Sequence, residues 1–448
     1  MKILTLPEVR RYAASSCRIG DFQEYRLDLS KDWDHDTFSL FTTSAILTAR
    51  GDALSQEMLN LMIHSKPLVD LDIKDYQCFP DAIPASRLIL SIHLDTFDAN
   101  KIHEFLMLQI DAIFYKIIFL CNHFAEILIT KDLIQKSGKT NVIFNVTGKW
   151  SKLQRSLYQD FGSIGYYAAW DKVLVPNQIH EKEISSIRVN IRDSHTKIYG
   201  IVGDIKVNRS LSLTKYNELF HSAAFNACIL PLPAEDLEEL ILVLRFLFSR
   251  YTPAGLVVTS PFKKNLANYF QSELGVINTV KLTPTAFGNG HYHSELGLFV
   301  SCTNTDLDAL KQALKILYIN AQDHICIYGS GDCAEIFGSF LLSNGFYNLN
   351  IIARNAAKAS ELCSNLKLKS TLTRENYDLL INASFLGWDD SDEIGALPAF
   401  KKLIDLPYRA DGKPTTLSIR AIQDNIPLLN GTDFWHLQHE SQKKFLLS

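Results

Sequence analysis

The sequence lacks several features that would assign it to a class at once. None of its eight cysteines stands in a C-x-x-C pair or at zinc-ligand spacing from a histidine, so we predict reduced thiols and no metal site. No apolar run approaches the roughly 18 residues of a membrane span, and the start lacks the apolar stretch of a secretory signal. A net charge of −4 gives no general basic surface for nucleic acid or anionic lipid. We therefore expect a cytoplasmic protein without nucleic-acid or membrane partners.

Short apolar runs recur through the first part of the 448-residue chain, which is long enough for two or three domains. Stretches compatible with helices separate several of them, for example 52–64, 99–109 and 122–129. This alternation predicts a (β/α)8 barrel, with functional residues at the C-terminal ends of its strands. The eight strand candidates are 1–6, 24–29, 45–49, 68–73, 88–92, 113–120, 141–146 and 164–170.

A second start is predicted at 197–203, after the polar segment 181–196. Further strands are expected at 227–232 and 255–259, and a helix at 234–248. No internal repeat or low-complexity tract is found. The second half is therefore expected to be a separate α/β region.

Two of the apolar runs carry residues suited to covalent and acid–base chemistry. His93 follows the run 88–92, and Lys116 lies within 113–120. Burial in a strand favours a neutral lysine amine that can attack a ketone, and a nearby histidine can move protons near pH 7. Taken singly, a packed core histidine and a solvent-facing lysine remain open alternatives.

Together with their neighbours, these residues resemble type I 3-dehydroquinate dehydratase. Similar motifs lie at 24–28 (Glu-Tyr-Arg-Leu-Asp) and 47–50 (Leu-Thr-Ala-Arg). The segment from Arg155 through 161–163 (Phe-Gly-Ser) to 175–178 (Val-Pro-Asn-Gln) matches the family's closing segment without a gap.

The resemblance implies a Schiff-base mechanism. Lys116 would condense with the C3 ketone of 3-dehydroquinate, and the iminium would acidify the C2 proton. His93 would remove that proton and then protonate the departing C1 hydroxyl. Arg155 would pair with the substrate carboxylate. The remaining positioning groups would be Glu24, Arg26, Arg50 and Gln178.

Two positions depart from the family's pattern. Leu174 stands where the closing loop usually has a serine, and Leu54 stands where an acid is expected after Arg50. Both changes affect substrate binding and leave the lysine and the histidine in place. We therefore expect dehydratase activity with a weakened KM.

Motifs in the second half resemble those of shikimate dehydrogenase. They are 208–212 (Asn-Arg-Ser-Leu-Ser), 258–263 (Val-Thr-Ser-Pro-Phe-Lys) and 275–280 (Gly-Val-Ile-Asn-Thr-Val). The resemblance implies that Lys263 donates a proton to the substrate carbonyl as hydride arrives. The alternative is a solvated lysine at a helix start. The implied substrate ligands are Ser210, Ser212, Thr259, Asn278 and Gln438.

A dinucleotide-binding unit is predicted where the strand 325–328 runs into a glycine-rich turn and a helix. Gly329 permits the tight turn, Gly331 lets the backbone approach a pyrophosphate, and Ala334 is small enough for close helix packing. The helix N-terminus adds amide donors for the phosphates.

The predicted cofactor is NADP. About 20 residues after the turn, where an NAD-dependent enzyme places an acid, the sequence has Arg354, Asn355 and Lys358. Two cations there suit a 2′-phosphate, with plain surface solvation as the alternative. Asn382 matches the family's strand-end motif beside the nicotinamide.

One loop does not fit the resemblance. The active family pattern has an Asn-Thr-Asp loop whose aspartate partners the lysine, and we align it with 290–297 (Gly-His-Tyr-His-Ser-Glu-Leu-Gly). Tyr292 and Ser294 then replace the Asn and the Asp. A shift of one residue would let Glu295 supply the carboxylate, and His291 or His293 could supply a proton.

These inferences combine into a bifunctional enzyme of the shikimate pathway, a lyase followed by an oxidoreductase. The expected fold is α/β: a TIM barrel, then a two-lobed dehydrogenase with an α/β substrate lobe and a Rossmann NADP lobe. The expected bounds are 1–190, 197–320 (completed by about 422–448) and 321–421. The ligands would be 3-dehydroquinate, 3-dehydroshikimate and shikimate, in a monomer or homodimer. Two alternatives stay open: a dehydratase with an impaired, ligand-binding second half, and reduction of a quinate-like substrate.

Overall fold

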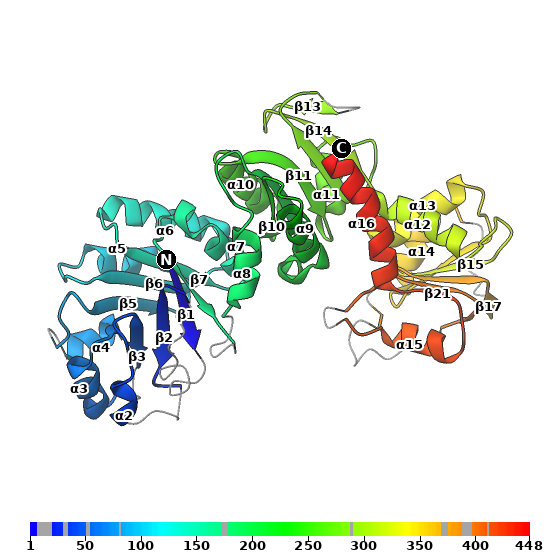
Figure 1. Ribbon diagram of the computed structural model, residues 1–448. Helices are drawn as coiled ribbons and strands as arrows, with labels where there is room; N and C mark the ends of the chain where they lie inside the picture. Colours follow the sequence, from blue (N-terminus) through cyan, green and yellow to red (C-terminus); the bar gives the residue numbers. More distant parts are fainter. Residues whose placement is uncertain are drawn as a thin grey trace. The chain divides into compact units, whose positions relative to one another are not determined.

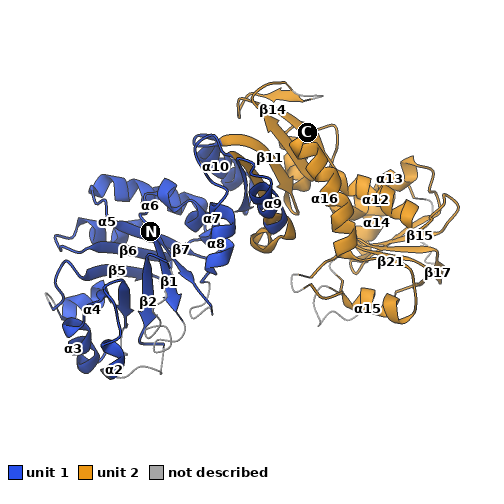
Figure 2. Ribbon diagram, viewed as in Figure 1, with its two compact units in different colours: residues 1–196, 214–251 blue, residues 197–213, 252–448 orange. Residues whose placement is uncertain are grey.

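We analysed a computed structural model of the chain. It describes residues 1–6, 20–29, 35–50, 54–79, 82–171, 178–286, 290–368, 375–384, 386–387, 397–409 and 412–448. Two compact units are present: residues 1–196 with 214–251, and residues 197–213 with 252–448 (Figure 2). The three domain bounds expected from the sequence stay a prediction.

The first unit contains an eight-stranded sheet in its described residues, with the order β7-β6-β5-β4-β3-β2-β1-β8. The strand pairs described in it are all parallel, as in a (β/α)8 barrel (Figure 1). The strands are β1 (Lys2–Leu6), β2 (Phe22–Arg26), β3 (Ala45–Thr48), β4 (Leu68–Asp72), β5 (Leu88–Leu94), β6 (Phe114–Leu120), β7 (Val142–Thr147) and β8 (Tyr166–Ala169).

Helices alternate with these strands along the chain. Several begin at a side chain that accepts a hydrogen bond from the first turn: Ser55 for α3, Asp72 for α4 and Asp98 for α5. The helices are α2 (His35–Phe38), α3 (Gln56–His64), α4 (Ile73–Cys78), α5 (Ala99–Met107), α6 (Phe124–Ser137), α7 (Ser151–Ser156), η2 (Tyr158–Phe161) and α8 (Glu181–Arg188).

Side chains from alternate strands fill the barrel in layers. Ile3, Ile46, Ile89 and Ile143, from β1, β3, β5 and β7, belong to one fully buried cluster. Glu24, Asp70 and Lys116, from β2, β4 and β6, are in register with three of these isoleucines and supply the next layer. The polar layer therefore lies directly on an apolar floor.

Side chains tie together β7 and β8, the two ends of the sheet order. The Tyr167 amide donates to Asn145 Oδ1 at 2.8 Å, and the Phe144 amide donates to Ser163 Oγ at 2.8 Å. The barrel is thus nearly closed, with side-chain bonds in place of one strand ladder.

Residues 214–251 belong to the barrel's unit and comprise most of α9 (Leu211–Ser222), β10 (Ala227–Pro233) and α10 (Leu237–Phe248). Glu239 on α10 is 8% exposed and accepts hydrogen bonds from the Phe124 amide at 2.8 Å and from Trp150 Nε1 at 3.0 Å. Lys149 Nζ lies 3.1 Å from its second oxygen. The Phe246 ring stacks on Phe161 at 4.8 Å. One buried carboxylate and an aromatic contact therefore attach α10 to the barrel.

Replacing Glu239 with alanine is expected to destabilise this unit by about 3 kcal/mol, because it leaves two buried donors, the Phe124 amide and the Trp150 indole, without their acceptor. Lys149 keeps its ion pair with Glu235 at 2.8 Å. The midpoint of the unit's urea unfolding transition measures this loss. Glu238→Ala, on the exposed face of the same helix, should change stability by less than about 0.5 kcal/mol. Equal shifts for the two variants would contradict the assigned role of Glu239.

In its described residues, the second unit contains two larger sheets and one two-stranded sheet. One runs β9-β11-β12-β14-β13, parallel between β9 and β11 and antiparallel beyond. The segment 290–297, expected to be a catalytic loop, contains β13, which pairs with β14. The elements are β9 (Lys197–Gly203), η3 (Ile205–Arg209), β11 (Thr252–Val258), α11 (Phe262–Tyr269), β12 (Thr279–Thr283), β13 (His291–His293), β14 (Leu298–Thr303) and α12 (Thr305–Ile316).

The other large sheet is parallel, with the order β16-β15-β18-β20-β21. Strand order reverses at β15, and this is the switch point at which doubly wound sheets bind ligands. Its elements, with the two-stranded sheet β17-β19, are β15 (Ile325–Tyr328), α13 (Asp332–Ser343), β16 (Leu349–Ile352), α14 (Ala356–Asn365), β17 (Asn376–Tyr377), β18 (Leu379–Asn382), β19 (Ala399–Phe400), β20 (Leu403–Asp405), α15 (Thr416–Gln423) and β21 (Leu428–Leu429).

The final helix, α16 (Gly431–Leu447), packs on α12 and contacts both β12 and β20 (Figure 1). Asn430 and Asp433 form a capping box at its start. The predicted α/β fold class, a barrel followed by a Rossmann-type sheet, is confirmed. In the part of the chain that the structure describes, no helix is both long and apolar enough to cross a membrane.

Candidate active sites

A cavity of about 400 Å³ opens at the C-terminal ends of the barrel strands. Among its lining residues are all seven side chains that the sequence assigned to the first site: Lys116, His93, Glu24, Arg26, Arg50, Arg155 and Gln178. The strand-end position follows from the barrel geometry, because parallel strands direct their C-terminal ends to one face.

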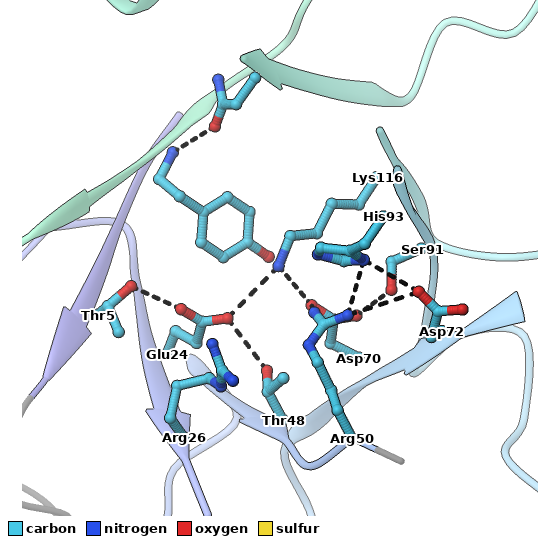
Figure 3. Close-up of polar contacts among 12 residues, drawn as sticks. Thr5, Glu24, Arg26, Thr48, Arg50, Asp70, Asp72, Ser91, His93 and Lys116 are labelled. Carbon is cyan, nitrogen blue, oxygen red and sulfur yellow. Dashed lines mark hydrogen bonds and ion pairs between the residues drawn. The ribbon is translucent and has the colours of Figure 1, made fainter. Parts of the chain in front are cut away.

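Lys116 lies deep in this cavity and is 2% exposed. Its Nζ lies 2.6 Å from Asp70 Oδ2 and 3.4 Å from Glu24 Oε1 (Figure 3). The ammonium is also 3.8 Å from the centre of the Tyr167 ring. A buried lysine thus lies between two buried carboxylates, close to an aromatic face that favours a cation.

Both carboxylates are held as anions by the charges around them. Burial by itself would raise the pKa of Asp70, but Lys116 and Arg50 outweigh burial and hold that pKa well below its usual range. The pKa of Glu24 is also lowered, against burial, chiefly by Lys116. Thr5 and Thr48 donate hydrogen bonds to Glu24 at 2.6 and 3.2 Å (Figure 3). Lys116, Arg50 and Arg26 therefore offset the charges of the two buried carboxylates.

His93 is part of a second polar group at the cavity. Its Nδ1 lies 2.7 Å from Arg50 Nη1 and 3.0 Å from Asp72 Oδ2 (Figure 3). Burial lowers the pKa of His93 to about 4, although Asp72 opposes that shift. The ring is therefore neutral at physiological pH and can accept a proton.

The predicted substrate-binding residues differ in how many of their hydrogen-bonding groups already have partners within the protein. Arg155 is 3% exposed, and its Nε and Nη1 donate to the backbone carbonyls of Tyr167 and Val146 at 2.9 and 2.5 Å. Among the described residues, no acceptor takes its Nη2. Arg26 forms a two-point ion pair with Asp28, at 2.9 and 2.6 Å.

Sequence reasoning missed Asp70, Asp72 and Tyr167. A signal was available in β4, Leu-Val-Asp-Leu-Asp, where two carboxylates two residues apart face the same side of an otherwise apolar strand. Leu174 lies outside the described residues. Leu54 is described and lies directly before Ser55, the N-cap of α3.

The second candidate site is built around Lys263, on the first turn of α11. Its Nζ lies 2.6 Å from Asp306 Oδ2 and 3.5 Å from the Cys333 sulfur. Burial by itself would lower the pKa of Lys263, but Asp306 outweighs burial, and the pKa is raised well above its usual value. Lys263 therefore carries its proton at neutral pH.

This geometry corrects the expected partner of Lys263. Glu295 is exposed and accepts a hydrogen bond from the Tyr269 hydroxyl at 2.8 Å, so it does not hold the position beside the lysine. The sequence Asn304-Thr305-Asp306, directly after β14, is a literal match to the Asn-Thr-Asp pattern that we aligned with 290–297. The alignment failed because it did not allow for the hairpin of β13 and β14 before the motif.

The same turn connects several of the predicted substrate ligands. Asn304 caps α12 and accepts a hydrogen bond from the Asp306 amide at 3.1 Å. Asn278 Oδ1 accepts from the Thr305 amide at 2.9 Å, and Gln438 Nε2 donates to Thr305 Oγ1 at 3.3 Å. Within the described residues, the buried Asn278 Nδ2 has no partner. It is a donor suited to a substrate hydroxyl.

The remaining substrate ligands already form protein contacts. Thr259 donates to the Val202 carbonyl at 3.0 Å. Ser210 forms a hydrogen bond with Tyr408, and Ser212, 5% exposed, accepts from Trp435 Nε1 at 3.1 Å. The structure thus holds the two serines in separate hydrogen-bond networks.

The glycine-rich turn after β15 has the shape expected for a phosphate site. Gly329 has φ +144°, and a Cβ there would lie 2.6 Å from the Ala383 carbonyl oxygen, so only glycine fits. A Cβ on Gly331, the N-cap of α13, would meet nothing within 4 Å. Ala334 is fully buried. Open space therefore lies at the residue that begins the helix.

The predicted cofactor residues beyond this turn fall into two groups. Arg354 and Asn355 are exposed just after β16, where Asn355 caps α14, and Lys358 is exposed on the first turn of that helix. Asn382 is fully buried, and its Nδ2 donates to the Leu386 carbonyl at 3.0 Å and to Asp405 at 2.7 Å. Both of its amide hydrogens are thus used within the protein.

Two acids occupy the first turn of α13, close to the expected phosphates. Lys264 Nζ lies 2.5 Å from Glu335 and 3.5 Å from Asp332. This lysine, next to Lys263, offsets charges that would otherwise repel a pyrophosphate at the helix N-terminus.

Comparison with known proteins gives similarities mainly to shikimate dehydrogenases. No protein-family model matches the chain. A shikimate dehydrogenase-like protein of Haemophilus influenzae is 23% identical over 194 residues, which is 43% of this chain and 68% of that protein.

Two solved structures illustrate the range of similar folds. The dehydroquinate dehydratase and shikimate dehydrogenase from S. pombe AroM is 16% identical, covers 99% of this chain and 95% of its own, and has a TM-score of 0.39. The Thermus thermophilus shikimate 5-dehydrogenase in complex with NADP(H) and shikimate is 18% identical, covers 56% of this chain and 92% of its own, and has a TM-score of 0.44.

Proposed function

We propose that this chain is a bifunctional shikimate-pathway enzyme that dehydrates 3-dehydroquinate in the barrel and reduces the product to shikimate in the second unit. The observation that carries the proposal is that each unit holds a buried lysine 2.6 Å from a carboxylate, within the motif that suggested the chemistry. The similarity to a shikimate dehydrogenase-like relative supports the second activity.

In the barrel, Lys116 attacks the C3 ketone, and loss of water gives an iminium. The amine must be neutral when it attacks, so Nζ first gives a proton to water, and Asp70, at 2.6 Å, holds Nζ in position. His93 then removes the C2 proton, and the electron pair moves into the iminium. The C1 hydroxyl leaves as water after protonation by the same histidine, and hydrolysis of the iminium releases 3-dehydroshikimate and restores the amine.

In the second unit, Lys263 protonates the carbonyl oxygen as that oxygen becomes an alkoxide. Asp306 keeps the lysine charged and directs it, because the ion pair fixes the Nζ position. Asn278 Nδ2 offers a hydrogen bond to a ring hydroxyl. Gln438 reaches the same turn through Thr305.

The residues at the Rossmann-type sheet fit a bound NADP. Gly331 and the amides that begin α13 would face the pyrophosphate, and Arg354 with Lys358 would face the 2′-phosphate. NADPH supplies the hydride when it is bound. Asn382 orders the strand end through its hydrogen bond to Asp405.

The alternative, in which the second half binds ligand without turning it over, has lost its main support. It depended on a missing partner for Lys263, and Asp306 fills that place. Reduction of a quinate-like substrate stays open to experiment, since the pocket's polar contacts determine which hydroxyls it accepts.

A steady-state assay tests the proposal. With 3-dehydroquinate alone, the enone absorbance should rise, and with NADPH added it should fall again as the nicotinamide band disappears. An enone that forms without NADPH consumption would leave only the dehydratase. Borohydride added with substrate should trap an adduct on Lys116, and its absence would reject the Schiff-base mechanism.

A further inference from the structure

Two groups compete for one ring nitrogen of His93. Arg50 Nη1 lies 2.7 Å from Nδ1, and Asp72 Oδ2 lies 3.0 Å from the same atom (Figure 3). Within the described residues, both polar contacts of the ring go to Nδ1. A guanidinium can only donate a hydrogen bond and a carboxylate can only accept one, so each contact requires a different tautomer.

The tautomer decides whether His93 can act as a base on a substrate in the cavity. If Nδ1 carries the proton and donates to Asp72, Nε2 has a lone pair. If Nδ1 accepts from Arg50, Nε2 carries the proton and cannot remove another. The pKa of His93, lowered by burial to about 4, leaves the ring neutral at pH 7, so one of these two forms is always present.

Asp72 is fixed in the orientation that selects the basic form. It ends β4 and caps α4, and its Oδ1 accepts from the Lys74 amide at 3.2 Å, which turns Oδ2 toward His93. Arg50 has other partners, since its Nη2 lies 3.2 Å from Asp70 and its Nη1 lies 3.7 Å from Asp72. Arg50 can therefore leave Nδ1 at little cost, whereas Asp72 cannot turn away without losing the cap.

We infer that Asp72 is the positioning residue for the dehydratase base: it holds the proton on Nδ1 of His93, against Arg50, and keeps Nε2 ready to accept the substrate's C2 proton. This inference rests on the proposed function. A bound anionic substrate draws Arg50 toward itself and leaves Nδ1 to Asp72.

The other charged groups around the ring do not provide the same contact. Lys116 on β6 and Arg50 after β3 disfavour a protonated ring, and Asp70 on β4 favours it. Among the acids on these elements, Asp72 is the one for which the structure records a hydrogen bond to the ring.

Asp72→Asn tests the inference. The amide oxygen can keep the bond to the Lys74 amide, and the amide nitrogen then faces Nδ1 and donates to it, which selects the non-basic tautomer. We expect kcat for dehydration to fall about 100-fold with KM changed little, since an amide in place of an orienting carboxylate gives the wrong tautomer. Asp72→Glu should recover part of the rate.

Asp98→Asn is the matched control. Asp98 caps α5, the next barrel helix, by accepting from the Lys101 amide at 3.1 Å, and it does not line the cavity. This variant loses a capping carboxylate of the same kind, so its kcat should equal that of the wild type. An equal loss of rate in Asp98→Asn and Asp72→Asn would show that helix capping alone matters and would overturn the inference.

Ring nitrogen NMR with ¹⁵N-labelled histidine gives a second readout. The His93 signals, assigned by their loss in His93→Gln, should show a protonated Nδ1 in the substrate-bound wild type and a protonated Nε2 in Asp72→Asn. The same tautomer in both proteins would overturn the inference, whatever the rates. Borohydride trapping on Lys116 is measured separately, so failure of the Schiff-base proposal would be recognised as such.

Discussion

Replacing Lys116 with methionine is expected to lower the dehydratase kcat by about 10⁴-fold or more, because it removes the buried amine that forms the covalent intermediate. Lys74, which also lines the cavity, is exposed. A methionine side chain fills a volume similar to that of the lysine in the layer above the isoleucines, and it has no amine to attack the ketone. The enone absorbance formed from 3-dehydroquinate measures the rate, and borohydride trapping with mass spectrometry measures the adduct. Reduction of added 3-dehydroshikimate should be unchanged in the same protein.

A loss of activity through unfolding must be separated from a loss of chemistry. Removing Lys116 leaves Glu24 and Asp70 buried with one cation fewer, and breaking such a pair costs about 3–5 kcal/mol. The double variant Lys116→Met with Asp70→Asn removes one anion as well and should recover much of this stability. It should stay as inactive as the single variant.

Lys152→Met is the matched control for a buried lysine in the same barrel. Lys152 is 6% exposed and pairs with Glu183 at 2.5 Å, and it does not line the cavity. Its replacement should destabilise the barrel without removing the adduct. Dehydratase turnover in a folded Lys116→Met protein would reject the role assigned to Lys116.

Replacing Asp306 with asparagine is expected to lower kcat for reduction of 3-dehydroshikimate by about 10³-fold, within the range that positioned acid–base groups contribute. The amide keeps the shape of the side chain but removes the charge that fixes the lysine and holds its proton. Oxidation of NADPH measures the rate. The dehydratase activity of the same protein should be unchanged.

The pH dependence gives this prediction a direction. Asp306 raises the pKa of Lys263 against the effect of burial. Without that charge, Cys333 alone among the groups that raise the pKa of Lys263 still opposes burial, and the pKa falls. Reduction requires the protonated lysine, so the basic limb of the pH–rate profile should move to lower pH in Asp306→Asn. A profile that stays in place would contradict the pairing.

Glu295→Gln separates the structure-based assignment from the one that the sequence suggested. Glu295 is exposed in the turn between β13 and β14 and accepts a hydrogen bond from Tyr269 on α11. Its replacement should leave reduction within about twofold of the wild type, as surface substitutions usually do. A large loss in Glu295→Gln with normal activity in Asp306→Asn would restore the original assignment.

The sequence was most informative where an unusual residue interrupts a regular pattern. Lys116 and His93 stood out because charged residues are rare in buried strands, and the glycine-rich turn stood out because Gly329 and Gly331 follow a strand. Such local signals depend on backbone geometry and side-chain period, which a sequence carries directly.

It was least informative about which side chains meet. Asp70 is 46 positions from Lys116, and Asp306 is 43 positions from Lys263. In both cases the contact exists because strand register or a helix start brings distant segments together. A one-residue error in register moves a side chain to the opposite face of a strand, so sequence spacing could not select the right acid.

The sequence by itself thus determined the α/β class and the barrel and Rossmann-type order, because periodicity and turn chemistry are local properties of the chain. Its resemblance to two families suggested the lysines of both candidate sites. Only the tertiary structure decided that Asp306 partners Lys263 in place of Glu295, that Asp70 and Glu24 flank Lys116, and that Asp72 faces His93. Electrostatic partnership depends on distances of a few ångströms and on removal from water, and both are set by the packing of segments far apart in the chain.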